Sequence, residues 1–94
     1  MYNQVVTLKP NALFINNDKF ANIKDVIEKQ NKKVNDFGSF ICIEHDKFMI
    51  TLSELYELEI YYNDYDTEID SNIIDLEKII KSRIKPFEFL YTKN

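Results

Sequence analysis

Two β-prone runs, residues 40–44 and 47–51, flank the pair His45-Asp46 in the middle of the chain. Side chains two residues apart in an extended strand share one face, so this stretch predicts a β-hairpin with its turn at that pair. The predicted register places Ile43 opposite Phe48, although a turn without Gly or Asn is equally compatible with a longer loop. The side chains predicted to face the core from this hairpin are Ile41, Ile43, Phe48 and Ile50.

A further hairpin is predicted near the start of the chain. Residues 2–8 and 12–15 are β-prone or apolar, and the turn signal Lys9-Pro10-Asn11 lies between them. At the other end of the chain, aromatic residues alternate with other side chains over residues 87–91 after Pro86. This pattern predicts a closing strand.

Helical spacing of apolar residues appears in two segments. Ile23, Val26 and Ile27 recur at intervals of three and four residues, which predicts a helix capped by Asn22 that fades near Asn35. A later helix is predicted to begin at Asp70 or Ser71 and to end before Pro86. Its apolar stripe consists of Ile73, Leu76, Ile79, Ile80 and Ile84.

The segment between these regions gives conflicting signals. Thr51 and Glu54 match a capping box, and Ile50 can pack on Leu55 as a hydrophobic staple, so a helix from Thr51 toward Tyr62 is favoured. Residues 57–62 also alternate between acidic and apolar or aromatic side chains, as a strand would. Both interpretations stay open for residues 57–62.

The resulting order is ββαββααβ, with two β-hairpins, about three helices and a C-terminal strand. We therefore expect a small α+β protein in which residues 1–94 form a single compact domain. The chain is 45% hydrophobic and 30% charged, which supplies enough apolar material for a core and argues against disorder.

Several function classes lack their characteristic residues. The single cysteine, Cys42, excludes an intramolecular disulfide and any zinc site that needs several cysteines. His45 is the single histidine and is expected to be exposed at a hairpin turn, and the one glycine excludes glycine-rich phosphate loops. We therefore expect no enzymatic activity and no cofactor. With no signal-like or membrane-spanning run, a cytoplasmic protein is expected.

Charge is distributed unevenly along the chain. Residues 48–77 contain nine acidic residues and neither Lys nor Arg, whereas the net charge of the whole chain is only −4. We call these nine residues the acidic band: Glu54, Glu57, Glu59, Asp64, Asp66, Glu68, Asp70, Asp75 and Glu77.

Four of the six tyrosines lie in the same thirty residues. Tyrosine combines an apolar ring with a polar tip and is enriched in protein interfaces, while the carboxylates would attract a basic partner. We therefore predict a partner-binding surface without bound metal. Its residues are Glu57, Glu59, Tyr61, Tyr62, Asp64, Tyr65, Asp66 and Glu68.

These observations favour a small acidic protein that binds and inhibits a basic protein. The partner would be a nucleic-acid-binding enzyme such as a host-defence nuclease, blocked because the carboxylates imitate a polyanion. The A/T-rich codons of the abundant Asn, Ile and Lys make a phage or mobile element a plausible source of the gene. Direct binding of nucleic acid is disfavoured by a pI near 4.9.

Two alternatives remain for the acidic band. It is a solvated rim of a structural or oligomer-forming domain, or it is a degenerate calcium loop of the EF-hand type. Asp66 would be the first position of that loop and Glu77 the twelfth, but Ser71 stands where the loop normally has Gly.

Overall fold

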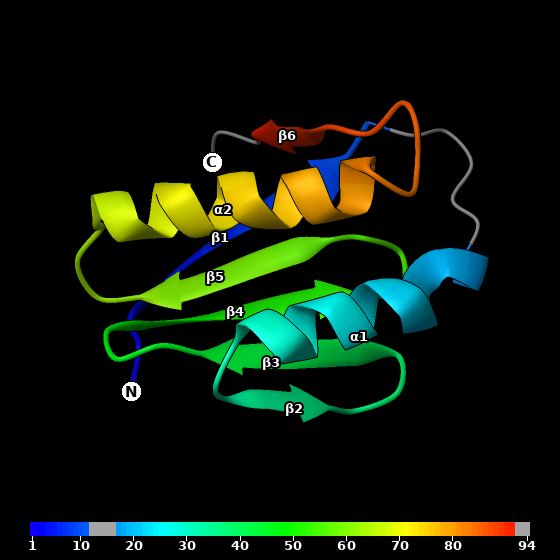
Figure 1. Cartoon of the computed structure of the whole chain (residues 1–94). Coiled ribbons are helices and arrows are strands. Elements are labelled where there is room, and N and C mark those ends of the chain that lie inside the picture. Colours follow the sequence, from blue (N-terminus) through cyan, green and yellow to red (C-terminus); the bar gives the residue numbers. More distant parts are fainter. Residues whose placement is uncertain (12–16, 92–94) are drawn as a thin grey trace.

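The structure is a computed structural model that describes residues 1–11 and 17–91 (Figure 1). The described elements are, in chain order, β1 (Gln4–Pro10), the 3₁₀ turn η1 (Asn17–Lys19), α1 (Phe20–Gln30), β2 (Val34–Asp36), β3 (Phe40–Glu44), β4 (Phe48–Ser53), β5 (Leu58–Tyr62), α2 (Thr67–Lys81) and β6 (Phe89–Tyr91). The described part of the chain is thus a small α+β structure, as the sequence predicts.

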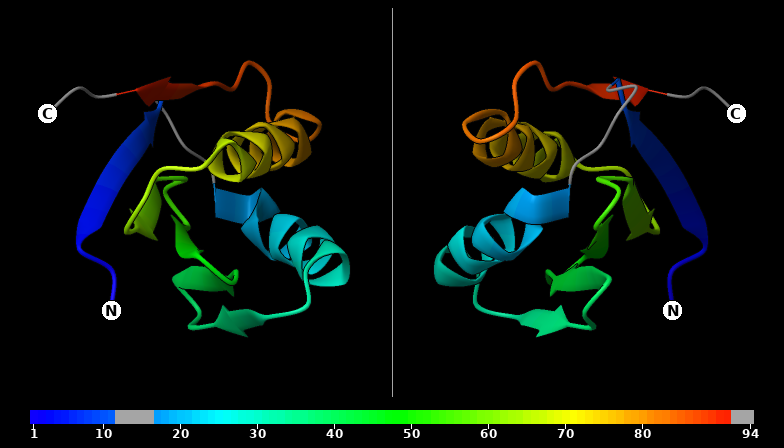
Figure 2. Two further views of the ribbon diagram at one scale, coloured as in Figure 1. Left: turned by 90° about the vertical axis from the view of Figure 1, so that its left-hand side faces the viewer. Right: turned by 90° about the vertical axis from the view of Figure 1, so that its right-hand side faces the viewer.

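The strands form one antiparallel sheet in the order β2-β3-β4-β5-β1-β6. Both helices lie on the same side of this sheet, which is clearest when the molecule is viewed from its ends (Figure 2). The architecture is therefore two layers, with a sheet on one side and a helix pair on the other. Among the described residues no helix is long and apolar enough to cross a membrane.

The core fills the space between the sheet and the helices. The strand pairing Leu8–Leu58 and Val6–Ile60 brings alternate residues of β1 and β5 to the helix-facing side. Ile23 and Ile27 of α1 belong to the same core and are fully buried, because the helical period places them on one stripe. The remaining side chains of the core are Phe20, Ile41, Ile43, Phe48, Ile50, Leu52, Tyr56, Ile69, Ile73, Leu76, Ile80, Phe87 and Phe89.

The predicted helix from Thr51 to Tyr62 is wrong, because β4 continues to Ser53 and residues 58–62 form β5. The side chain of Ser53 does cap backbone amides, but in a turn. Its Oγ accepts the N–H groups of Leu55 and Glu57, both at 3.2 Å, and its carbonyl accepts the N–H of Tyr56 at 2.8 Å. Strand pairing of β4 with β3 and β5 outweighs the local preference for a helix start.

The predicted central hairpin forms, but in a different register. In the β3–β4 hairpin Ile43 pairs with Ile50 rather than Phe48, a shift of two residues that lengthens the loop. Because the shift is even, Ile41, Ile43, Phe48 and Ile50 still face the core, as predicted. The predicted second strand of the first hairpin, residues 12–15, lies outside the described residues; among the described strands, β1 pairs with β5 and β6.

The helices begin earlier than predicted and fewer are found among the described residues. α1 starts at Phe20 after Lys19 rather than at Asn22, and α2 starts at Thr67. The cap of α2 is Asp66, whose carboxylate accepts the N–H of Glu68 at 2.9 Å. This start adds Ile69 to the buried stripe, and the predicted cap, Asp70 or Ser71, lies four or five residues too late.

Candidate partner-binding site

A hollow of about 360 Å³ lies at the end of the sheet where β5 passes into α2. We call it the acidic hollow. It is lined by Tyr2, Asp46, Lys47, Asn63, Asp64, Tyr65 and Asp66. The lining thus includes three carboxylates, two tyrosines and one lysine. A cationic group of a partner would meet negative charge and aromatic surface here.

Local hydrogen bonds hold the loop of residues 63–66 that forms most of this hollow. The side chain of Asn63 accepts the N–H of Asn3 at 2.9 Å, which fastens the loop to the start of the chain. Asp66 ends the loop as the cap of α2. Between these two residues, Tyr65 packs edge-on against Tyr62 with ring centroids 5.4 Å apart and donates a hydrogen bond to Asp70.

The carboxylates of the acidic band lack cationic partners within the described part of the chain. There the ion pairs join Lys24 to Asp36 at 3.2 Å and Lys29 to Asp25 at 3.0 Å. Neither pair includes a residue of the acidic band. Asp46 is in neither pair, and the three carboxylates of the hollow outnumber its one lysine, so the hollow keeps a net negative charge toward an external cation.

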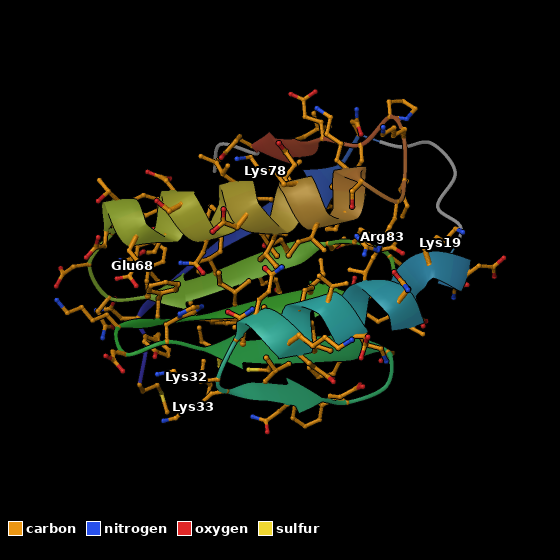
Figure 3. The ribbon with its side chains drawn as sticks, viewed as in Figure 1. Lys19, Lys32, Lys33, Glu68, Lys78 and Arg83 are labelled. Carbon is orange, nitrogen blue, oxygen red and sulfur yellow. The ribbon has the colours of Figure 1, made fainter. Side chains whose placement is uncertain are left out.

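A neighbouring hollow of about 400 Å³ shares Asp46 and Lys47 with the acidic hollow and reaches the end of α1. It carries as many lysines as carboxylates, because Lys32 and Lys33 join Lys47 opposite Glu44, Asp46 and Glu68. Figure 3 shows Glu68 above Lys32 and Lys33 at this end of the molecule. This second hollow is therefore much less acidic than the first.

His45 also lines the second hollow, and the prediction that it is exposed is wrong. Its ring stacks on Phe48 with centroids 4.4 Å apart, and its Nε2 atom is buried without a hydrogen-bond partner. Burial lowers the pKa of this imidazole, while the carboxylates of Glu68 and Asp46 act in the opposite direction. His45 is thus a packed residue of the loop rather than a solvated one.

The structure distributes the predicted site residues over several surfaces. Asp64, Tyr65 and Asp66 line the acidic hollow, and Glu68 lines its neighbour. Glu59 and Tyr61 alternate with the buried residues of β5 and so belong to the sheet face that points away from the helices, whereas Glu57 lies in the turn before β5. Tyr62 instead packs partly against the core.

Sequence reasoning missed Tyr2 and Asp46 as parts of the site. Tyr2 lies 63 residues before Tyr65 in the sequence, and both line the same hollow only because β1 pairs with β5. Asp46 belongs to the turn between β3 and β4. The periodicity of the sequence holds no signal for either, since both contacts depend on strand order.

The segment that the calcium-loop alternative requires to be a loop is mostly helical. Residues 67–77, all but the first of the twelve loop positions, lie within α2. The described residues also contain no group of three or more His, Cys, Asp or Glu side chains arranged to hold a metal ion. The backbone that an EF-hand wraps around its ion is therefore not formed by this segment.

No family model matches the chain, and no curated protein and no solved structure matches it either. The candidate function therefore rests on the residues of the chain itself.

Proposed function

We propose that this protein binds a basic protein partner through the acidic hollow. The observation that carries the proposal is the set of three carboxylates, Asp46, Asp64 and Asp66, which converge on one hollow with two tyrosines and have no ion pair to a described residue. Carboxylates placed in this way steer a cationic partner toward the site, and tyrosine rings supply contact area once it has arrived.

The partner that fits best is a nucleic-acid-binding enzyme, such as a host-defence nuclease. Such an enzyme presents lysine and arginine side chains in a groove that normally receives phosphates. Asp64 and Asp66 both line the acidic hollow and are two residues apart, which in an extended chain corresponds to about 6.7 Å and is close to the phosphate spacing of a nucleic acid strand. The bound protein would inhibit the enzyme by occupying the groove, without any chemical step.

The experiment compares three forms of the full chain as baits in host lysate. A hollow variant carries Asp46→Asn, Asp64→Asn and Asp66→Asn, and a control variant carries Glu28→Gln, Asp75→Asn and Glu88→Gln. Both variants lose three negative charges, and the control positions are exposed and outside the acidic hollow. Asn is a good helix cap, so the Asp66 substitution preserves the start of α2.

We expect the wild type and the control variant to retain the same basic nucleic-acid-binding enzyme, and the hollow variant to lose it. Addition of the wild-type protein should then weaken the binding of nucleic acid by the purified enzyme. Equal retention by all three baits would contradict the proposal and would favour the interpretation of the acidic band as a solvated rim.

A further inference from the structure

A second group of aromatic and acidic side chains lies where α2 passes β6. We call it the tyrosine ledge: Tyr62, Tyr65, Asp70, Ile74, Glu77 and Tyr91. Tyr65 belongs to both surfaces, whereas Asp70, Ile74, Glu77 and Tyr91 do not line the acidic hollow. β6 lies next to α2 in the view of Figure 1 and in the end views of Figure 2.

On the helix side of the ledge, Tyr65 contacts both Asp70 and Tyr62. Its hydroxyl donates to Asp70 on the first turn of α2, and its ring meets the ring of Tyr62 at 87°. Ile74 and Glu77 follow Asp70 at intervals of four and seven residues, so all three side chains share one face of the helix. The ledge is therefore a continuous row along α2.

On the strand side of the ledge, Glu77 links α2 to β6. Its Oε2 atom accepts the backbone N–H of Phe89 at 2.9 Å and so fastens β6 to α2. Tyr91 lies two residues further along β6 and shares the sheet face of Phe89. Burial raises the pKa of the Tyr91 hydroxyl, and the carboxylates of Asp70 and Glu77 raise it further because they lie close by.

The side chains of the ledge are accessible to a partner. Tyr65 and Ile74 are each 50% exposed and Tyr91 is 66% exposed, so three large apolar or aromatic groups of the described surface gather around two carboxylates. Neither carboxylate has an ion pair within the described residues. A planar cation could stack on a ring and donate hydrogen bonds to a carboxylate at the same time.

We infer that the tyrosine ledge binds an arginine side chain of the basic protein partner, an inference that rests on the proposed function. Arginine fits better than lysine because its guanidinium group is flat, stacks on aromatic rings and presents paired donors to a carboxylate. Lysine offers a compact, strongly hydrated charge with no such plane. The ledge therefore gives the site a preference for arginine that the carboxylates alone would not provide.

The test uses hexa-arginine and hexa-lysine peptides as probes, titrated into the full chain and followed by NMR. The test variant is Tyr91→Leu, and Tyr61→Leu is the matched control because Tyr61 lies on the outer face of the sheet. In the wild type we expect hexa-arginine to bind more tightly than hexa-lysine. Tyr91→Leu should weaken hexa-arginine binding about two- to fivefold, with less effect on hexa-lysine. Tyr61→Leu and Tyr91→Phe should keep the preference.

The outcomes separate this inference from the proposed function. If the preference for hexa-arginine is the same in Tyr91→Leu as in the wild type, the ledge is not an arginine site. If, in addition, the hollow variant has lost binding of both peptides, the cation site at the acidic hollow stands and only the ledge is overturned. If neither variant changes the binding of either peptide, both assignments are overturned.

Discussion

At the scale of single residues, Tyr56 is the least expected feature of the core. It has a positive φ of 61°, which is uncommon for a residue other than glycine, and it is fully buried. Its ring meets Phe20 and Phe87 edge-on, at 5.8 and 5.9 Å. Its hydroxyl is buried without a hydrogen-bond partner, a group that costs folding free energy.

We predict that Tyr56→Phe raises the free energy of unfolding by about 1 kcal/mol, because the unpaired hydroxyl is removed while the ring contacts remain. Tyr56→Ala should lower it by about 3–5 kcal/mol, because the core loses the ring. Urea unfolding of the three proteins gives both values. A Tyr56→Phe protein that is clearly less stable than the wild type would show that the hydroxyl has a partner.

His45 should make stability depend on pH near neutrality. Burial lowers the pKa of the imidazole in the folded protein, and the carboxylates of Glu68 and Asp46 oppose this shift. Lys32, Lys33 and Lys47 line the same hollow as the imidazole. The unfolded chain therefore binds the proton more readily than the folded chain, and stability falls as the pH drops through about 6.5 toward the folded-state pKa.

We expect the free energy of unfolding to decrease more between pH 7.5 and pH 6.0 in the wild type than in His45→Gln, which has no imidazole. Urea unfolding at the two pH values measures the difference for each protein. The comparison within each protein removes the effect of the lost stacking on Phe48. Equal decreases in both proteins would mean that His45 does not titrate in this range.

At the scale of elements, the sequence predicts the long, strongly periodic elements best. The core face of the β3–β4 hairpin follows from alternation, and most of α2 follows from its isoleucine stripe. Residues 51–62 could not be predicted, because the capping pattern at Thr51 is a local signal that is outweighed by strand pairing on both sides of β4. Of the acidic hollow, the sequence indicates Asp64, Tyr65 and Asp66, while Tyr2 and Asp46 join them only through the order of the strands.

Asp66 has two separable roles at the start of α2. As the helix cap, its carboxylate accepts the N–H of Glu68, and as a member of the acidic hollow it contributes charge. We predict that Asp66→Ala lowers the free energy of unfolding by about 1 kcal/mol, whereas Asp66→Asn changes it little because the amide oxygen still caps the helix. Thermal or urea unfolding distinguishes the two. Equal losses in both variants would assign the effect to charge near the helix end rather than to the cap.

At the scale of the whole molecule, the acidic band does not form a single surface. Glu54 lies beside the β2–β3 turn, where its N–H bonds to the carbonyl of Ser39 at 2.8 Å, while Asp64 lies at the opposite end of the sheet. The molecule measures 33 × 29 × 21 Å. A partner that binds at one end of the sheet therefore cannot contact all nine carboxylates. Under the proposed function, the acidic band would attract a basic partner over a distance, and the acidic hollow would make the close contact.

The most direct test of this account is the affinity of the captured basic enzyme for the wild type, the hollow variant and the control variant, measured over a range of salt concentrations. Because the two variants have equal net charge, a general effect of charge would weaken both equally. We predict that the hollow variant binds much more weakly than the control variant and that its affinity depends less on salt. Equal affinities and equal salt dependence in the two variants would contradict the assignment of the acidic hollow as the binding site.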